Sequence, residues 1–123
     1  MNHEQLMRDY YHTYNSEDPA ALRAFYADDV VLLSAQGEIR GPDAILATYQ
    51  HITGQFLDQM TPTRIAVDGD TAVVDITDRF TAKLDVADFM GLAFKQGESL
   101  ELALRGTYTI ADGRFRRIVI ESV

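Results

Sequence analysis

Asp78 is the side chain of this sequence whose surroundings point most clearly to chemistry. It lies in residues 71–84, TAVVDITDRFTAKL, which alternate between an apolar face and a polar face as a β-strand does. Asp78 is the one charged residue on the apolar face, and loss of hydration there is expected to raise its pKa above the ordinary value. A carboxyl group of this kind is suited to general acid–base catalysis in a pocket.

A structural role for Asp78 is the alternative. A buried carboxylate that accepts hydrogen bonds from Tyr10, Tyr14 or a backbone amide needs no ligand to explain it. No Lys or Arg falls on the same face of the segment, so we expect desolvation rather than ion pairing to govern its pKa.

Several other polar side chains lie on faces that are predicted to point inward. Four tyrosines could donate hydrogen bonds to a ligand or fill the core, namely Tyr10, Tyr14, Tyr49 and Tyr108. Ser34 could also be a donor, but no inward-facing His could activate it as a nucleophile. The three histidines share no spacing with a carboxylate pair, and the sequence lacks phosphate-loop and dinucleotide motifs. We therefore predict no metal and no cofactor.

Length and composition indicate one ordinary globular domain over residues 1–123. Hydrophobic residues make up 46% of the chain and charged residues 24%. The net charge of −8 argues against nucleic acid as a partner, and no apolar run is long enough to cross a membrane. The absence of cysteine and of a secretory-type N-terminal segment favours a cytoplasmic location.

The first half of the chain predicts three helices. Residues 4–15 carry apolar side chains every four positions, and Asp18-Pro19 is a typical start for a short second helix that would bury Leu22, Phe25 and Tyr26. A third helix is predicted from Pro42 onwards. Its apolar stripe consists of Ile45, Tyr49, Ile52 and Phe56.

The rest of the chain predicts antiparallel strands. They cover residues 30–34, 63–67, 71–84, 100–110 and 114–122, and Asp-Gly pairs mark two of the hairpin turns. Residues 85–99 interrupt this pattern, and we predict one or two helical turns there, capped by Asp85. The large apolar residues of this insert should cover either the mouth of a pocket or a partner subunit. Helices first and strands afterwards indicate an α+β fold with the helices on one face of a curved, mixed sheet.

Three stretches give this pattern a family resemblance. They are Phe25-Tyr26-Ala27-Asp28-Asp29-Val30, Gly41-Pro42-Asp43-Ala44-Ile45 and the closing hairpin from Tyr108 to Ile118. Together they resemble the SnoaL-like branch of the nuclear transport factor 2-like superfamily. The resemblance implies a cystatin-like, cone-shaped sheet wrapped around three N-terminal helices, often dimeric through the outer face of the sheet.

The superfamily that the chain resembles includes enzymes and binding proteins, and their site patterns match this chain only in part. Tyr10 falls where ketosteroid isomerases keep an oxyanion-binding tyrosine, but Ser34 and Gly106 replace their two acids. Asp78 falls where epoxide hydrolases keep a catalytic Asp, but Ile76 replaces the partner Arg. Neither set is complete, and fold alone does not determine activity.

Residues and resemblance together predict an enzyme that acts without a cofactor on a small apolar organic molecule. Asp78 would be the acid or base, and Tyr10 would donate a hydrogen bond to a developing oxyanion. The alternative is a non-catalytic protein that binds a hydrophobic ligand or serves as a dimeric accessory subunit. Twelve further residues are expected to contact the ligand: Tyr14, Ser34, Tyr49, Ile52, Phe56, Ile76, Phe80, Phe89, Phe94, Leu104, Tyr108 and Ile120.

Overall fold

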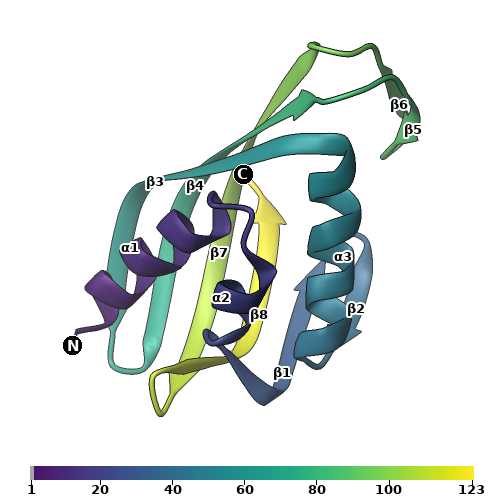
Figure 1. Ribbon diagram of the computed structural model, residues 1–123. Coiled ribbons are helices and arrows are strands. Elements are labelled where there is room, and N and C mark those ends of the chain that lie inside the picture. Colours follow the sequence, from purple (N-terminus) through teal and green to yellow (C-terminus); the bar gives the residue numbers. More distant parts are fainter. Residues whose placement is uncertain (1) are drawn as a thin grey trace.

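In the computed structural model, which describes residues 2–123, three helices lie against a large curved sheet (Figure 1). The helices are α1 (His3–Tyr14), α2 (Pro19–Arg23) and α3 (Pro42–Gln55). The strands are β1 (Tyr26–Ser34), β2 (Gly37–Arg40), β3 (Phe56–Asp68), β4 (Thr71–Ala82), β5 (Val86–Phe89), β6 (Leu92–Phe94), β7 (Ser99–Ala111) and β8 (Arg114–Ser122). No helix in the described part of the chain is long and apolar enough to cross a membrane.

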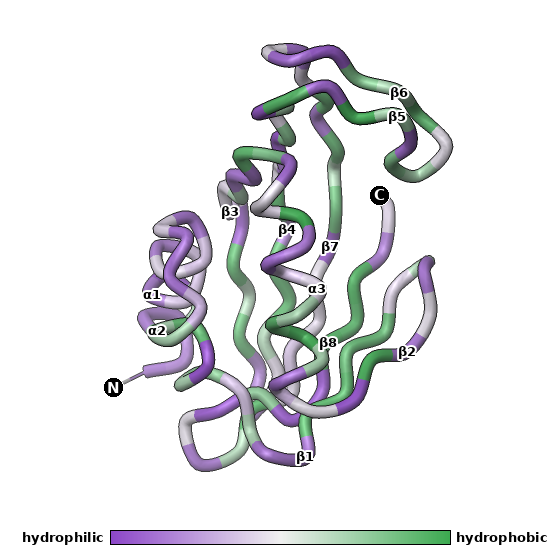
Figure 2. The backbone as a smooth tube through the Cα atoms, turned by 45° about the vertical axis from the view of Figure 1, so that its right-hand side comes forward, coloured by the Kyte–Doolittle hydropathy of each residue, from purple (hydrophilic) through white to green (hydrophobic). Residues whose placement is uncertain are grey.

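Six strands form the main sheet in the order β2-β1-β8-β7-β4-β3. All neighbours are antiparallel except β1 and β8, which are parallel, so the sheet is mixed. Strands β3, β4 and β7 each contain 12 or 13 residues, and the sheet curves around α1 and α3 (Figures 1 and 2). The predicted α+β class, with a curved mixed sheet around three N-terminal helices, is confirmed.

The two faces of β4 are those that its alternation predicts. Val74, Ile76 and Asp78 are buried under the helices, whereas Asp75 lies on the outer face, where its Oδ1 accepts a hydrogen bond from Arg105 Nε at 2.8 Å. The apolar pattern continues past the end of the strand, however. Leu84 was expected on the buried face, but it follows Ala82, the last residue of β4, and is exposed.

The end of α1 is fixed to the edge of the sheet by Asn15. Its Nδ2 donates to the carbonyl of Met60 and its Oδ1 accepts from the Met60 amide, both at 2.8 Å. Met60 lies on β3, the edge strand, and its backbone groups point away from β4. The Asn15 amide therefore satisfies two backbone groups that the sheet leaves unpaired.

The boundaries of the third helix and its neighbours differ from the prediction. Helix α3 ends at Gln55, and Phe56 is already the first residue of β3, which extends the predicted strand 63–67 by seven residues towards the N-terminus. The helical spacing of Phe56 relative to Ile52 is therefore coincidental. In the same way, β1 begins at Tyr26 rather than at Val30, and a register irregularity between Tyr26 and Val31 accommodates the acidic residues between them.

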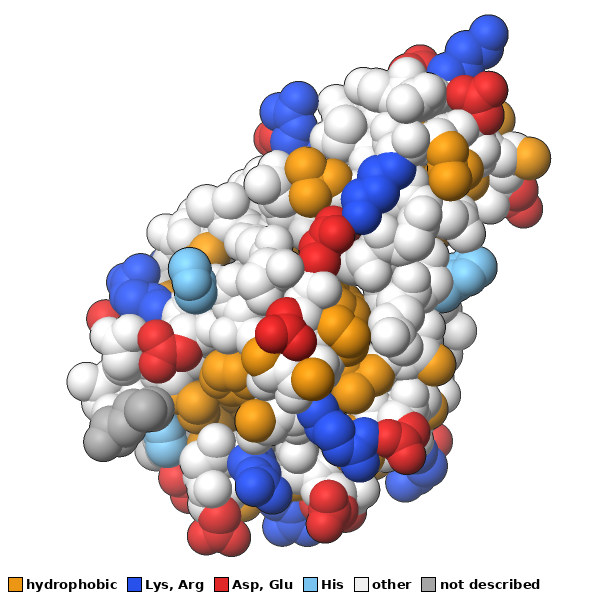
Figure 3. Space-filling view, in the orientation of Figure 1, with side chains coloured by type: hydrophobic (Ala, Val, Ile, Leu, Met, Phe, Trp, Pro, Cys, Tyr) orange, Lys and Arg blue, Asp and Glu red, His pale blue; other side chains and the backbone are white. Residues whose placement is uncertain are grey.

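The insert of residues 85–99 is a β-hairpin, not the helical turns that were predicted. Strands β5 and β6 pair around Met90 and Gly91, whose φ angles of 55° and 80° match the left-handed two-residue turn of a hairpin. Asp85 caps no helix, and its Oδ1 accepts from the backbone amide of Gln96 at 2.9 Å. This arm projects beyond the main sheet (Figure 2), and hydrophobic side chains are exposed on it at the upper right of Figure 3.

Candidate functional site

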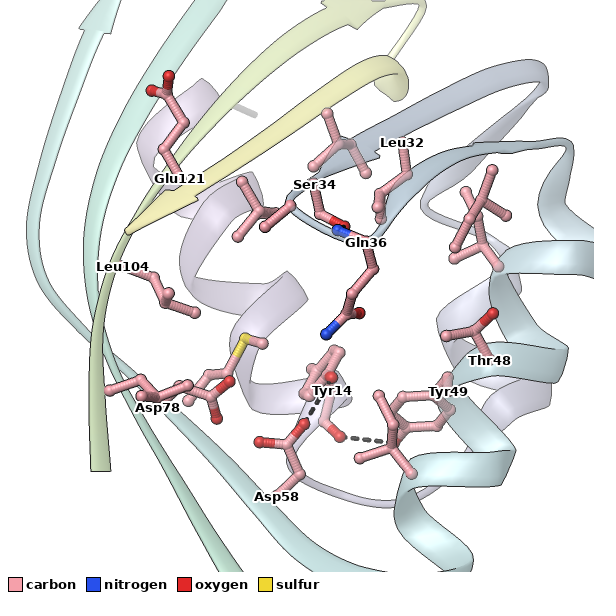
Figure 4. A pocket seen from close by; sticks show the side chains of 18 of the residues that line it. Tyr14, Leu32, Ser34, Gln36, Thr48, Tyr49, Asp58, Asp78, Leu104 and Glu121 are labelled. Atoms are coloured by element: carbon pink, nitrogen blue, oxygen red, sulfur yellow. Dashed lines mark hydrogen bonds between the residues drawn. The ribbon is translucent and has the colours of Figure 1, made fainter. Parts of the chain in front are cut away.

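A cavity of about 200 Å³ lies between the helices and the concave face of the sheet. Its walls are mainly aliphatic and aromatic, and Figure 4 shows polar side chains reaching into it from several elements. The polar lining residues are Tyr10, Tyr14, Tyr26, Ser34, Gln36, Thr48, Tyr49, Asp58, Asp78, Tyr108, Glu121 and Ser122. The chemistry of the site depends on how these few groups are arranged.

Two carboxyl groups, Asp58 and Asp78, lie beside each other on the cavity wall. In the antiparallel register of β3 and β4, Asp58 is opposite Phe80 and Asp78 is opposite Met60. The two acids are therefore diagonal neighbours on the same face of the sheet, within reach of each other. Each is only 1% exposed, and both point into the cavity in Figure 4.

The two carboxyl groups differ in their hydrogen-bond partners. Tyr14 donates its hydroxyl proton to Asp58 Oδ2 at 2.8 Å, and Tyr49 donates to the backbone carbonyl of Tyr14 at 2.6 Å. Asp58 Oδ1 and Asp78 Oδ1 are buried without a hydrogen-bond partner among residues 2–123. The helices thus supply one donor to the pair and direct it to Asp58.

The electrostatics of the pair favour a proton on Asp78. Burial raises the pKa of Asp78 far above its ordinary range, and the neighbouring Asp58 raises it further. Burial also raises the pKa of Asp58, but hydrogen bonds from Asp78 and Tyr14 oppose that rise. Because two adjacent buried carboxylates repel each other, the pair loses its protons in two separated steps and the second is suppressed. The hydrogen bond from Tyr14 favours the remaining charge on Asp58. The expected direction for Asp78 agrees with this, although the expected cause, burial alone, omitted its acidic neighbour.

Tyr10, expected to donate to a developing oxyanion, is engaged with another tyrosine. Its hydroxyl lies 2.9 Å from that of Tyr26, and its ring packs edge-on against Phe115 at a centroid distance of 4.8 Å. Burial raises its pKa, so the hydroxyl stays protonated. Tyr10 lines the cavity, but the structure places Tyr14, not Tyr10, in contact with the carboxyl pair.

The position of the isomerases' second acid is filled in a different way here. A Cβ atom built on Gly106 would lie 2.7 Å from Cε1 of Tyr108, so the tyrosine ring covers the glycine directly. The Tyr108 hydroxyl is 2.6 Å from that of Tyr11. An aromatic ring thus occupies the space into which a side chain at residue 106 would project.

Most residues expected to contact a ligand do line the cavity. They are Tyr10, Tyr14, Ser34, Tyr49, Ile52, Asp78, Phe80, Phe89, Leu104, Tyr108 and Ile120. Phe56, Ile76 and Phe94 do not line it. Ile76 is packed in the main core, and Phe56 and Phe94 belong to a second buried cluster beneath the β5–β6 arm.

The most important residue that sequence reasoning missed is Asp58. Residues 56–60 alternate in burial, with Phe56 and Asp58 buried, but the helix prediction was carried through Phe56 and hid the strand. Met60, Gln36 and Glu121 also line the cavity without having been identified. Among residues 2–123, no three His, Cys, Asp or Glu side chains are grouped to hold a metal ion.

Comparison with known proteins places the fold in a large group. The SnoaL-like domain family matches residues 7–118. None of the curated proteins compared with the chain matches it significantly.

Three solved structures illustrate the range of similar proteins. A protein from Xanthomonas campestris proposed to be a polyketide cyclase has a TM-score of 0.84 and 20% identity, covering 98% of this chain and 89% of its own. An LEH-like epoxide hydrolase from M. tuberculosis has a TM-score of 0.78 and 17% identity, with coverage of 97% and 80%. A ketosteroid isomerase-like protein from Catenulispora acidiphila, solved with trimethylamine, has a TM-score of 0.77 and 12% identity, with coverage of 94% and 82%. At these identities the likeness establishes the fold alone.

Proposed function

The chain belongs to the SnoaL-like domain family, and from this premise we propose that it is a cofactor-independent enzyme acting on a small, largely apolar organic molecule. Asp78 in its protonated form is the general acid, and the ionised Asp58 is its basic partner. Tyr14 is a positioning residue that holds the charge on Asp58 through its hydrogen bond. Reactions suited to this pair are isomerisation, cyclisation, elimination and epoxide opening, because each needs a proton delivered or removed.

One observation carries the proposal: two adjacent carboxyl groups are buried in an apolar cavity and each has a buried oxygen without a partner. Burying a carboxyl group without its full set of hydrogen bonds costs on the order of several kcal/mol of folding free energy. An ordinary core would hold apolar residues at both positions. A pair of carboxyl groups whose pKa values are separated by their surroundings is a typical arrangement for proton transfer.

The names of similar proteins support this class of reaction without selecting one. Polyketide cyclisation and epoxide hydrolysis, named for two of them, are both acid–base reactions. The local residues differ from the expected sets, however, since Ile76 stands where an epoxide hydrolase Arg would be and Ser34 where an isomerase Asp would be. We therefore propose the pair of acids as the reactive group in place of either set.

A binding protein without catalysis is the second candidate. The observation that favours it is the Tyr10–Tyr26 hydrogen bond, which uses the donor expected to stabilise an oxyanion when Tyr10 is the donating partner. The cavity then serves only to hold a hydrophobic ligand, and the carboxyl pair gives that ligand its orientation.

Turnover of a substrate panel distinguishes the two candidates. The panel contains a cyclic epoxide, a β,γ-unsaturated ketone and an aryl β-keto ester, one for each class of acid–base reaction. Any measurable turnover should fall by about 100-fold or more in Asp78→Asn. Asp75→Asn is the matched control, because it makes the same change on the outer face of the same strand. Turnover that is equal in wild type and Asp78→Asn would refute the catalytic role of Asp78.

A further inference from the structure

The charge of the cavity is entirely negative. The acids that point into it are Asp58 and Asp78, and its lining residues within the described chain include no Lys, Arg or His. Glu121 borders the cavity, but its exposed side chain lies on the outer face of the sheet opposite Arg105. A buried carboxylate is normally paired with a cation or several hydrogen-bond donors. Within the described chain, Asp58 accepts side-chain hydrogen bonds from two neutral groups, the Tyr14 hydroxyl and the protonated Asp78, and it has no cation as a partner.

Three donors on the helices beside the pair are already used, whereas each of the Tyr10–Tyr26 and Tyr11–Tyr108 hydroxyl pairs spends only one of its two protons on its own hydrogen bond. The Tyr14 hydroxyl donates a hydrogen bond to Asp58, and the Tyr49 hydroxyl donates one to the backbone carbonyl of Tyr14. The Thr48 hydroxyl donates to the backbone carbonyl of Ala44. Gln36 extends into the cavity from the β1–β2 turn (Figure 4), and its amide can both donate and accept. The proton of Asp78 serves one oxygen of the carboxyl pair, and the remaining carboxyl oxygens only accept, so a ligand that meets them must bring donors of its own.

We propose that the ligand of this cavity is an organic amine, bound as its ammonium ion against Asp58 and Asp78 with a ring-sized apolar body between the helices and the sheet. This assignment rests on the proposed function, because it names the substrate class of the same site. An ammonium group supplies up to three donors and no acceptor, which suits two buried carboxyl groups whose remaining oxygens can only accept. Its single positive charge matches a pair that carries one negative charge when Asp78 keeps its proton.

The walls of the cavity suit the same ligand. Rings of Tyr14, Tyr49 and Phe80 are part of the lining, and aromatic faces attract organic cations. The cavity volume of about 200 Å³ exceeds the ~150 Å³ of an engineered protein cavity that holds benzene. One aromatic ring with a short aminomethyl substituent is therefore the appropriate size. A carboxylate or phosphate of equal size would bring a second negative charge and no donors.

A series of ligands with equal shape and different charge tests the proposal. Benzylamine, benzyl alcohol and benzoate are titrated into the protein at pH 7 and followed by calorimetry. Benzylamine should bind at least tenfold more tightly than benzyl alcohol, and benzoate should show no saturable binding. Equal affinities for benzylamine and benzoate, or no saturable binding of benzylamine at millimolar concentration, would overturn the proposal.

Variants locate the binding site and separate this proposal from the catalytic one. Asp58→Asn should weaken benzylamine binding at least tenfold and leave benzyl alcohol binding unchanged, whereas Asp75→Asn should alter neither. If Asp58→Asn does not fold, as judged by circular dichroism, Asp58→Ala provides the comparison, because it also removes the carboxylate that carries the negative charge of the pair. Retained amine affinity in the folded variant would refute the assignment of the ligand class. Loss of turnover on neutral substrates in Asp78→Asn would still support catalysis in that event, so the two failures are distinguishable.

Discussion

Replacing Asp78 by Asn should change how the stability of the protein depends on pH. Asn is nearly the same size and stays neutral, and its side-chain amide can donate to Asp58 as a protonated Asp78 does. The pKa of Asp78 in the folded protein lies well above its ordinary value of 3.8, because burial and Asp58 disfavour its charge. The folded wild type therefore holds a proton that the unfolded chain releases.

The magnitude follows from proton linkage. A group whose pKa is raised on folding contributes stability that is fully present below its unfolded pKa and is lost as pH rises towards its folded pKa. One retained proton changes the free energy of unfolding by about 1.4 kcal/mol per pH unit. Between pH 5 and pH 8, Asp78→Asn should gain about 4 kcal/mol relative to wild type, if the pair keeps the proton throughout.

Urea unfolding followed by circular dichroism at pH 5, 6, 7 and 8 measures this difference. The control is Asp75→Asn, on the outer face of the same strand. The hydrogen bond from Arg105 lowers the pKa of Asp75, so that carboxylate is ionised in both states above pH 5 and its removal adds no slope. A difference between wild type and Asp78→Asn that stays constant from pH 5 to pH 8 would show that the pair holds no extra proton. It would refute the assignment of Asp78 as a neutral acid.

Three further changes test the packing around the site, all by chemical denaturation. Gly106→Ala should cost about 1–3 kcal/mol, because the new methyl group would lie 2.7 Å from Cε1 of Tyr108; an unchanged midpoint would contradict this contact. Asn15→Ala should cost about 2 kcal/mol through the loss of both hydrogen bonds to Met60, whereas a loss below about 0.5 kcal/mol would show that water replaces them. Ile76→Lys should unfold the protein or cost more than about 3 kcal/mol, while Thr77→Lys should cost less than about 1 kcal/mol; reversed costs would mean that the faces of β4 are assigned wrongly.

Features governed by local alternation could be predicted from the sequence. The faces of β4 follow from the spacing of residues 71–82, and Asp112-Gly113 is the turn of the β7–β8 hairpin. The β3–β4 hairpin was also predicted, but its turn residues are Gly69 and Asp70, because Asp68 still pairs with Thr71. The burial of Asp78 and the direction of its pKa shift follow from the same alternation. These properties depend on near neighbours in the chain, which the sequence displays.

Asp58, the partner of Asp78, faces the cavity because helix α3 ends at Gln55, and this helix end is only weakly marked in the sequence. Gly54 lies in the last turn of the helix, but no Pro follows before Pro62, and Phe56 continues the helical spacing of Ile52. The chain nevertheless leaves the helix there, because Phe56 pairs with Ala82 and is buried against Phe80 and Phe94. Asp58 then faces the cavity two residues later. Tertiary packing decided this boundary over local pattern.

The β5–β6 arm was missed for a similar reason. Its turn places Met90 at a positive φ, a conformation that non-glycine residues seldom adopt, so no common turn motif announces it. The arm packs on the sheet through phenylalanines. Phe89 of the arm contacts Phe56, the first residue of β3, with ring centroids 4.6 Å apart. A contact between residues so distant along the chain has no trace in local periodicity.

The order of the strands has a consequence for how the protein comes to be folded. Strand β8 follows every other strand along the chain, yet it lies in the middle of the sheet between β1 and β7. Among the described strands, β1 and β2 pair with the rest of the sheet only through β8, so this part of the sheet can be completed only after β8 has been synthesised. During translation the hairpin of β3 and β4 can form early, because its strands are adjacent, whereas the two halves of the cavity join last. The carboxyl pair thus belongs to the half that can assemble first, and the pocket around it closes only after synthesis of the final strand.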